Sequence, residues 1–324
     1  MTGLAAALRA AGAACAVLCS AAAIAQSYPS RPIIFLVPAT TATSMDIMAR
    51  QIAPILSQRL GQPIVVENRV GASGNIGVAQ VARAAPDGYT VLVAANTISA
   101  APWLFRNLQF DPVADFAPVA KLAVTKFALV VHPSVEAKSM SDFVALAKKS
   151  PGQLNYASPG IATPHHLAME LFKQLAGIDV THIPYKGSAA AVTDLLGGRV
   201  QAAFTTVHSV LSQVQAGKLR ILAVASEKRA PWFPNIPTVA EEGIRGVDSD
   251  GWAAFMVPVK TPAEIVRRLT EETLAIVSQR EFRETALRQG VVVDPAGPEA
   301  LAALLKSDLA KWQKVIAQGR ISGD

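Results

Sequence analysis

Hydroxyl-bearing residues and glycines gather in short segments that each follow an apolar, strand-like run. In the second half of the chain these segments are 158–163, 186–188 and 205–208. In an open α/β sheet, ligands bind beyond the carboxyl ends of the strands, where the following helices present their N-termini. Free N–H groups and the positive end of the helix dipole favour an anion there. The residue types therefore predict a binding site for a small anion, such as a carboxylate.

The clearest of these helix starts is at Thr163 and Pro164. Threonine is a common N-cap residue, and proline suits the first helical position. Thr163 is therefore either an anion anchor or only the cap of its helix, and the sequence leaves both roles open. Gly187 permits close backbone approach and Ser188 has the residue type of a cap, whereas Lys186 alone is better explained as a solvated charge.

Motifs of the common hydrolases and nucleotide-binding enzymes are missing from the sequence. There is no G-x-S-x-G elbow, no phosphate-binding glycine loop ending in Lys-Ser or Lys-Thr, and no H-E-x-x-H, and the glycines at 71, 74 and 77 have the wrong spacing for a dinucleotide fingerprint. His165, His166 and Glu170 could share a helix face as metal ligands, but packing roles are favoured for them. Asp46 is expected to cap a helix rather than to act as a catalytic acid. We therefore predict no catalytic residue, no metal and no cofactor.

Alternating strand-like and helix-like runs must position these segments. This alternation is typical of βαβ units around a parallel sheet. The first series comprises strands at 33–37, 64–67 and 90–94 with helices at 46–60 and 75–84. The second comprises strands at 154–157, 180–185, 200–204 and 219–225 with helices at 164–176, 189–196 and 209–216. After a proline-rich passage come a strand at 252–257, helices within 262–289 and 298–318, and a short strand at 291–293.

The last elements are expected to pack back on the first series, so that the chain crosses twice between two lobes. The crossings are expected near 122–132 and 248–254. The predicted fold class is α/β, with two lobes that are each a mainly parallel sheet flanked by helices. Lobe 1 is expected to comprise 28–125 plus 250–324, and lobe 2 to comprise 126–249. Two crossings form a hinge with a cleft.

Composition agrees with an exported, globular protein of about two domains. The 324 residues are 51% hydrophobic and 17% charged, which excludes a disordered chain. Residues 1–25 combine Arg9, a short apolar stretch and an Ala-x-Ala site, which predicts a signal peptide and a periplasmic location. Both cysteines fall inside that leader, so disulfides are not expected. The net charge of +6 is scattered rather than clustered, which argues against a nucleic-acid partner.

Taken together, these residues resemble the Bug or TctC-type extracytoplasmic solute receptors, which serve tripartite tricarboxylate transporters. The resemblance covers essentially the whole mature chain. It is carried by short motifs in order along the sequence, among them YPSRP at 28–32, VENR at 66–69, GNIG at 74–77, AAPDGYT at 84–90, FDP at 110–112, PYKG at 184–187 and TDLLGG at 193–198.

The resemblance implies a two-lobed, type II (Venus-flytrap) periplasmic binding fold that closes on a small carboxylate by a hinge motion. It implies a non-catalytic monomer whose partners are that ligand and the membrane subunits of a tripartite tricarboxylate transporter or a sensor kinase. A sensor module and, less favoured, a secreted enzyme using His208 as a base are the alternatives. In such receptors one ligand carboxylate is held by the second lobe, which here maps onto Ser158, Ala162, Thr163 and Gly187. With the cleft segments of both lobes, the candidate ligand-binding residues are Ala39, Thr41, Thr43, Ser44, Asn96, Ser158, Ala162, Thr163, Gly187, Ser188 and Thr205.

Two departures from the family pattern concern the ligand. Residues 39–44 are Ala, Thr and Ser where relatives usually carry a glycine-rich loop, so hydroxyls replace backbone freedom. Thr205 stands where many relatives carry an acid that could pair with an ammonium group. We therefore expect α-amino acids to be poor ligands and unaminated carboxylates to be better ones.

Overall fold

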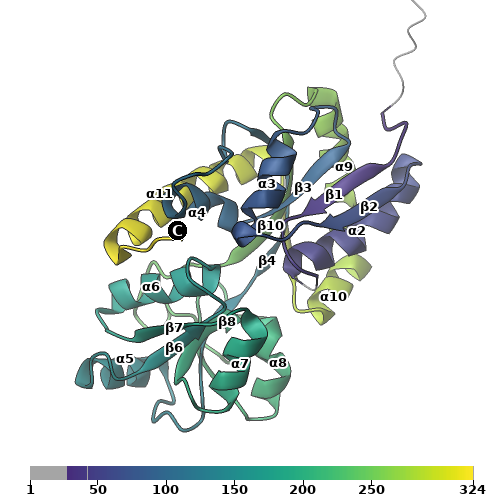
Figure 1. The fold of residues 1–324 in the computed structure, drawn as a ribbon. Helices are drawn as coiled ribbons and strands as arrows, with labels where there is room; N and C mark the ends of the chain where they lie inside the picture. The colour runs from purple at the N-terminus through teal and green to yellow at the C-terminus, as the bar shows by residue number, and fades with distance from the viewer. Residues whose placement is uncertain (1–27, 42, 324) are drawn as a thin grey trace, which may run out of the picture.

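Two β-sheets, each with helices on both faces, organise the computed structural model, which describes residues 28–41 and 43–323 (Figure 1). The predicted signal peptide lies outside the described residues. The first sheet has the strand order β11-β4-β10-β3-β1-β2 and the second β7-β6-β8-β5-β9. The two-lobed α/β architecture is therefore as predicted.

The first lobe contains the beginning and the end of the described chain. Its strands are β1 (Ile33–Val37), β2 (Ile64–Asn68), β3 (Thr90–Ala95), β4 (Phe116–Thr125), β10 (Gly251–Pro258) and β11 (Val292–Ala296). Its helices are α2 (Ser44–Leu60), the short η1 (Ala72–Gly74), α3 (Asn75–Ala82), α4 (Thr97–Leu104), α9 (Ala263–Val277), α10 (Arg280–Arg288) and α11 (Pro298–Gly319).

The second lobe is the middle of the chain. Its strands are β5 (Phe127–Val131), β6 (Asn155–Ser158), β7 (Thr181–Pro184), β8 (Ala202–Thr206) and β9 (Arg220–Val224). Its helices are α5 (Met140–Lys149), α6 (Pro164–Ala176), α7 (Ser188–Leu196) and α8 (Val207–Gln215). Apart from β4, β5, η1, α4 and α5, every helix and strand of the two lobes overlaps a segment predicted from the sequence.

Both sheets are mixed, which differs from the mainly parallel sheets expected. Parallel pairing is found for β1 with β2 and β3, and for β6 with β7 and β8. The strands β4, β5, β9, β10 and β11 pair antiparallel with their neighbours. Of these, β5 and β10 enter their sheets directly from the other lobe, so no βαβ crossover makes them parallel to their neighbours.

Alternation along the strands divides the core of lobe 1 between the two faces of its sheet. Phe35 and Val37 pack on one face against residues of α2 and α9, whereas Leu36 packs on the other against residues of α3, α4 and α11. The rings of Phe35 and Phe255 lie 4.5 Å apart at the centre of the first face. Central strands buried on both sides read as continuous apolar runs, which is why β1 and β3 were easily predicted.

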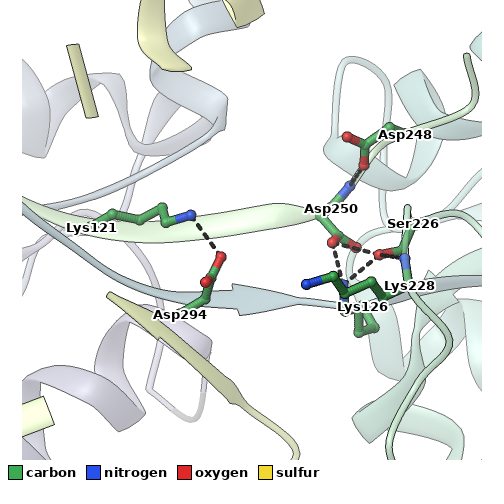
Figure 2. Close-up of polar contacts among 7 residues, drawn as sticks. All are labelled: Lys121, Lys126, Ser226, Lys228, Asp248, Asp250 and Asp294. Carbon is green, nitrogen blue, oxygen red and sulfur yellow. Dashed lines mark hydrogen bonds and ion pairs between the residues drawn. The ribbon is translucent and has the colours of Figure 1, made fainter. Parts of the chain in front are cut away.

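The chain leaves the first sheet after β4 and returns at β10, and three polar residues join these crossings. Lys126 lies between β4 and β5, Ser226 follows β9, and Asp250 precedes β10 (Figure 2). Lys126 Nζ lies 2.5 Å from Asp250 Oδ2 and donates to Ser226 Oγ, which donates to the same carboxylate oxygen at 2.7 Å. We call these three residues the hinge triad.

The hinge triad lies on the opposite side of the crossing strands from the predicted cleft. Lys126, Asp250 and Trp252 line a cavity of about 430 Å³ together with charged residues of both signs. Because neighbouring strand residues point to opposite sides, Phe127 and Gly251 face the other way. Phe127 indeed contacts the ring of His165, at the start of α6, with 5.0 Å between centroids.

A second contact between the lobes is apolar. Ala162, Leu167 and Leu171 of lobe 2 pack with a set of lobe 1 side chains from α4 and α11, namely Ala100, Leu104, Trp312, Val315 and Ile316. We call these eight residues the interlobe cluster.

Within the described residues, no helix combines the length and the apolar character that a membrane span requires.

Candidate functional site

The turn at 158–163, between β6 and α6, is held together by hydrogen bonds among its own residues and His166. Thr163 is the N-cap of α6: its Oγ1 accepts from the N–H of His166 at 3.4 Å and donates to the carbonyl of Gly160 at 2.8 Å. Pro164 occupies the first helical position. The predicted cap is therefore confirmed, while the role of Thr163 as an anion anchor stays a prediction.

Ala162 is held in a conformation that only glycine adopts readily. Its φ is +62°, and its N–H donates to Nδ1 of His166 at 3.0 Å. Its side chain is buried in the interlobe cluster. The N–H that the resemblance assigned to a ligand carboxylate is thus engaged within the turn in this structure.

Ser158 also works inside the turn. It is fully buried, its Oγ accepts from the N–H of Gly160 at 3.2 Å and donates to the Gly160 carbonyl at 2.9 Å. The same Oγ lies 2.6 Å from Nε2 of His182. The Ser158 side chain therefore stabilises the turn in this structure.

The other two lobe 2 segments meet this turn. The N–H of Gly187 donates to the carbonyl of Pro159 at 3.0 Å. Pro159, His165, Ser188 and Thr205 line one recess of about 10 Å³, which is about the space of a single water molecule. The three loops that the sequence singled out in lobe 2 therefore converge.

One detail of that convergence differs from the sequence expectation. Ser188 was expected to cap α7, but the N-cap is Gly187, with φ of +109°, and Ser188 is the exposed first residue of the helix. The positive φ is the reason for glycine at this cap, because a Cβ at Gly187 would meet no atom within 4 Å. Thr205, buried at the end of β8, lies with its Oγ1 3.1 Å from Oγ of Ser209.

In lobe 1 the loop before α2 is organised by Thr43 and Asn68. Thr43 is the N-cap of α2 and accepts from the N–H of Asp46 at 3.4 Å. Asn68, at the end of β2, donates to the carbonyl of Ala39 and to Asp46 Oδ1 at 3.1 and 3.0 Å. Thr41 is exposed and Ser44, the first residue of α2, is partly buried.

Asp46 is not itself the cap that the sequence predicted. It lies in the first turn of α2, where its charge suits the dipole. Its buried carboxylate accepts from Arg50 Nε at 3.0 Å as well as from Asn68. Asp46 therefore joins the end of β2 to the start of α2, while Thr43 occupies the N-cap position.

Asn96 lies at the part of lobe 1 that approaches lobe 2. It lies directly before α4, is 6% exposed, and its carbonyl accepts from both the N–H and the Oγ of Ser99. Ala100, in the first turn of the same helix, belongs to the interlobe cluster with Ala162. The N-terminal ends of α4 and α6 thus approach each other across the lobes.

Four histidines lie at this site; the sequence favours packing roles for His165 and His166 and gives no structural role to His182 or His208. His166 and His182 stack with 4.0 Å between centroids, and the Nδ1 atoms of His165 and His208 are both buried without a hydrogen-bond partner in the structure. Burial lowers the pKa of His165 and His182 to about 4 and also lowers the pKa of His166 and His208. The only available sequence signal was the position of His166, three residues after the Thr163 cap.

The residues considered as metal ligands have other partners. Glu170 accepts from the hydroxyl of Tyr156 and from Lys173 Nζ, both at 2.7 Å. His165 contacts the edge of Phe127, and His166 faces His182. Across 28–41 and 43–323, no group of three or more His, Cys, Asp or Glu residues is arranged to hold a metal ion.

Comparison with known proteins places this geometry in a family. Residues 48–320 match the model of the tripartite tricarboxylate transporter family receptor, TctC. Protein BugT of Bordetella pertussis is 34% identical over 296 residues, which is 91% of this chain and 91% of BugT. A solved R. palustris protein with adipate is 33% identical, with a TM-score of 0.81 over 91% of this chain and 99% of its own. MatC from Rhodopseudomonas palustris with bound malate is 29% identical, with a TM-score of 0.77 over 89% and 100%. The chain therefore belongs to the TctC family of tripartite tricarboxylate transporter receptors.

Proposed function

We propose that this protein is a periplasmic receptor that captures a small carboxylate between its lobes and delivers it to the membrane subunits of a tripartite tricarboxylate-type transporter. The observation that carries the proposal is the match to the receptor family along most of the chain, with relatives solved with adipate and with malate. The converging helix starts of lobe 2 supply the chemistry that such ligands need.

We propose that the ligand carboxylate binds at the start of α6. Within 158–166, the N–H groups of Gly160, Ala162 and His166 are engaged inside the turn, and Pro164 has none. The N–H groups of Ile161, Thr163 and His165 are therefore the donors proposed for the anion. The wider set proposed to surround the ligand remains Ala39, Thr41, Thr43, Ser44, Asn96, Ser158, Ala162, Thr163, Gly187, Ser188 and Thr205.

Capture then follows from the hinge. A ligand that contacts both lobes binds the closed form more tightly and shifts the equilibrium toward it. The closed form is the signal that a membrane partner reads. Nothing in this cycle requires a bond to be made or broken in the ligand, and we propose a receptor without catalysis.

The proposal is tested by thermal shift followed by calorimetry with succinate, adipate, malate and aspartate. A ligand at 100 times its Kd adds about 2.7 kcal/mol of stability, which is readily measured. Because Thr205 supplies no charge for an ammonium group, succinate is expected to bind more tightly than aspartate. Tighter binding of aspartate contradicts the assigned ligand class, and steady consumption of a bound acid, followed by NMR, contradicts the assignment as a receptor.

A further inference from the structure

The rings of His166 and His182 form a stacked pair next to the 158–163 turn. The rings are nearly parallel, with 9° between their planes and 4.0 Å between their centroids. His166 belongs to the first turn of α6 and His182 to β7. The ring of Tyr156, on β6, stacks on His182 at 4.8 Å and 17°. Three separate elements thus contribute one aromatic column.

Both histidines hold the turn by hydrogen bonds. Nδ1 of His166 accepts the N–H of Ala162 at 3.0 Å. Nε2 of His182 lies 2.6 Å from Oγ of Ser158, which in turn bonds both the N–H and the carbonyl of Gly160. The left-handed backbone of Ala162, unfavourable for a residue with a side chain, is therefore held in place by the His166 ring.

The identity of the donor fixes the protonation state of His166. A backbone N–H can only donate, so Nδ1 must carry a lone pair, and the ring must be neutral with its proton on Nε2. Resting on the proposed function, we propose that His166, supported by His182, is a positioning residue that sets the anion-binding turn and does so only while neutral.

The surroundings of the pair agree with a neutral state. Glu170 and Lys173, on α6 near the His166 ring, carry opposite charges and form an ion pair with each other. The other ring neighbours of His166 are Tyr156 on β6 and His182 on β7. Burial lowers the pKa of His166, and burial together with the neighbouring His166 lowers the pKa of His182 to about 4. A proton on His166 would turn Nδ1 into a donor that faces another donor, and would place a charge against the second ring.

A change in the 158–163 turn would also affect the contact between the lobes. Ala162 packs in the interlobe cluster with Ala100 and Leu104 of lobe 1. A change in its backbone conformation therefore alters the donors offered to the anion and the apolar contact between the lobes at the same time. Acidification is expected to weaken binding through both.

The test compares three variants by calorimetry with succinate, and with adipate in parallel, between pH 7.5 and 4.5. His166→Asn keeps an acceptor close to the position of Nδ1 but does not titrate, whereas His166→Leu removes the acceptor. His132→Asn is the matched control, because His132 Nδ1 also accepts a backbone N–H, from Ser134 at 3.2 Å, away from the site. The ligands themselves titrate, so affinities are compared as ratios to the wild type at each pH.

At pH 7.5 we expect His166→Asn to bind like the wild type and His166→Leu to bind about tenfold more weakly, the effect of one lost buried hydrogen bond. On acidification the ratio of His166→Asn to wild-type affinity should rise, while that of His132→Asn stays constant. Wild-type affinity in His166→Leu, or a constant ratio for His166→Asn, overturns the positioning role. Should His166→Leu fail to fold, the pH profile of His166→Asn decides alone. Absence of binding by the wild-type protein at every pH overturns instead the proposed function.

Discussion

The hinge triad gives a prediction whose size follows from its burial. The Lys126 side chain is 8% exposed and that of Asp250 is 19% exposed, with Nζ and Oδ2 2.5 Å apart. Replacing Lys126 with Met removes the counter-charge and leaves the mostly buried Asp250 carboxylate with Ser226 as its only donor within the hinge triad. Loss of one partner of a buried ion pair costs about 3–5 kcal/mol. Typical domains have a free energy of unfolding of about 5–15 kcal/mol, so the loss is large.

Urea unfolding followed by circular dichroism measures this loss for Lys126→Met against the wild type. The double variant Lys126→Met/Asp250→Asn should recover at least half of it, because the unpaired charge is then gone. Burial raises the pKa of Asp250 to about 6. Since protonation of Asp250 removes the buried charge, the loss in Lys126→Met should be smaller at pH 5 than at pH 8.

The matched control is Arg280→Met, which removes an exposed i,i+4 pair with Glu284 and should leave stability unchanged within error. The reasoning is refuted if Lys126→Met costs less than about 1 kcal/mol, the range of exposed pairs. It is equally refuted if the double variant is no more stable than the single one.

Three further predictions concern the cleft side. Burial lowers the pKa of His165 and His182 to about 4 in the folded chain, below the ordinary 6.5, so the unfolded chain binds more protons between these values. The free energy of unfolding should therefore fall as the pH drops from about 6.5 to 4. A melting temperature that stays constant over this range contradicts the burial of the two neutral rings. Thr163→Ala should lower the free energy of unfolding by about 1 kcal/mol through loss of the cap and weaken binding of any carboxylate, with Thr163→Ser as the control that retains both. Gly290→Ala should weaken ligand binding and widen the particle seen by small-angle scattering, because a Cβ there would lie 2.1 Å from Cβ of His208 on the other lobe; unchanged scattering and affinity would show that this contact is dispensable.

Elements with strong local signals were predictable from the sequence. Thr163 and Pro164 carry the start of α6 in their own residue types. The strands β4 and β5 were read only as a crossing, because an apolar run interrupted by Lys121 and Lys126 does not show where one sheet ends and the next begins. The return of β10 between β4 and β3 made the first sheet mixed, and no local pattern encodes that order.

The site shows the same division. Local caps such as Thr163 are encoded within a few residues, whereas the partner of Lys126 lies 124 residues away at Asp250. The left-handed backbone of Ala162 was not predictable, because alanine disfavours that conformation. The constraint comes from His166 and from packing against lobe 1. Ser158 and Thr163 were thus predictable as residues of the turn, whereas the histidines that bind it from α6 and β7 were not.

The interlobe cluster gives the hinge a thermal response. Opening the cleft must wet Leu167, Leu171 and their partners on α11, and the free energy of wetting apolar surface grows on warming from near freezing toward ordinary growth temperatures. The ligand-free receptor should therefore populate its closed form more as the temperature rises. A cold-adapted relative would need a more apolar interlobe cluster to keep the same balance of open and closed forms.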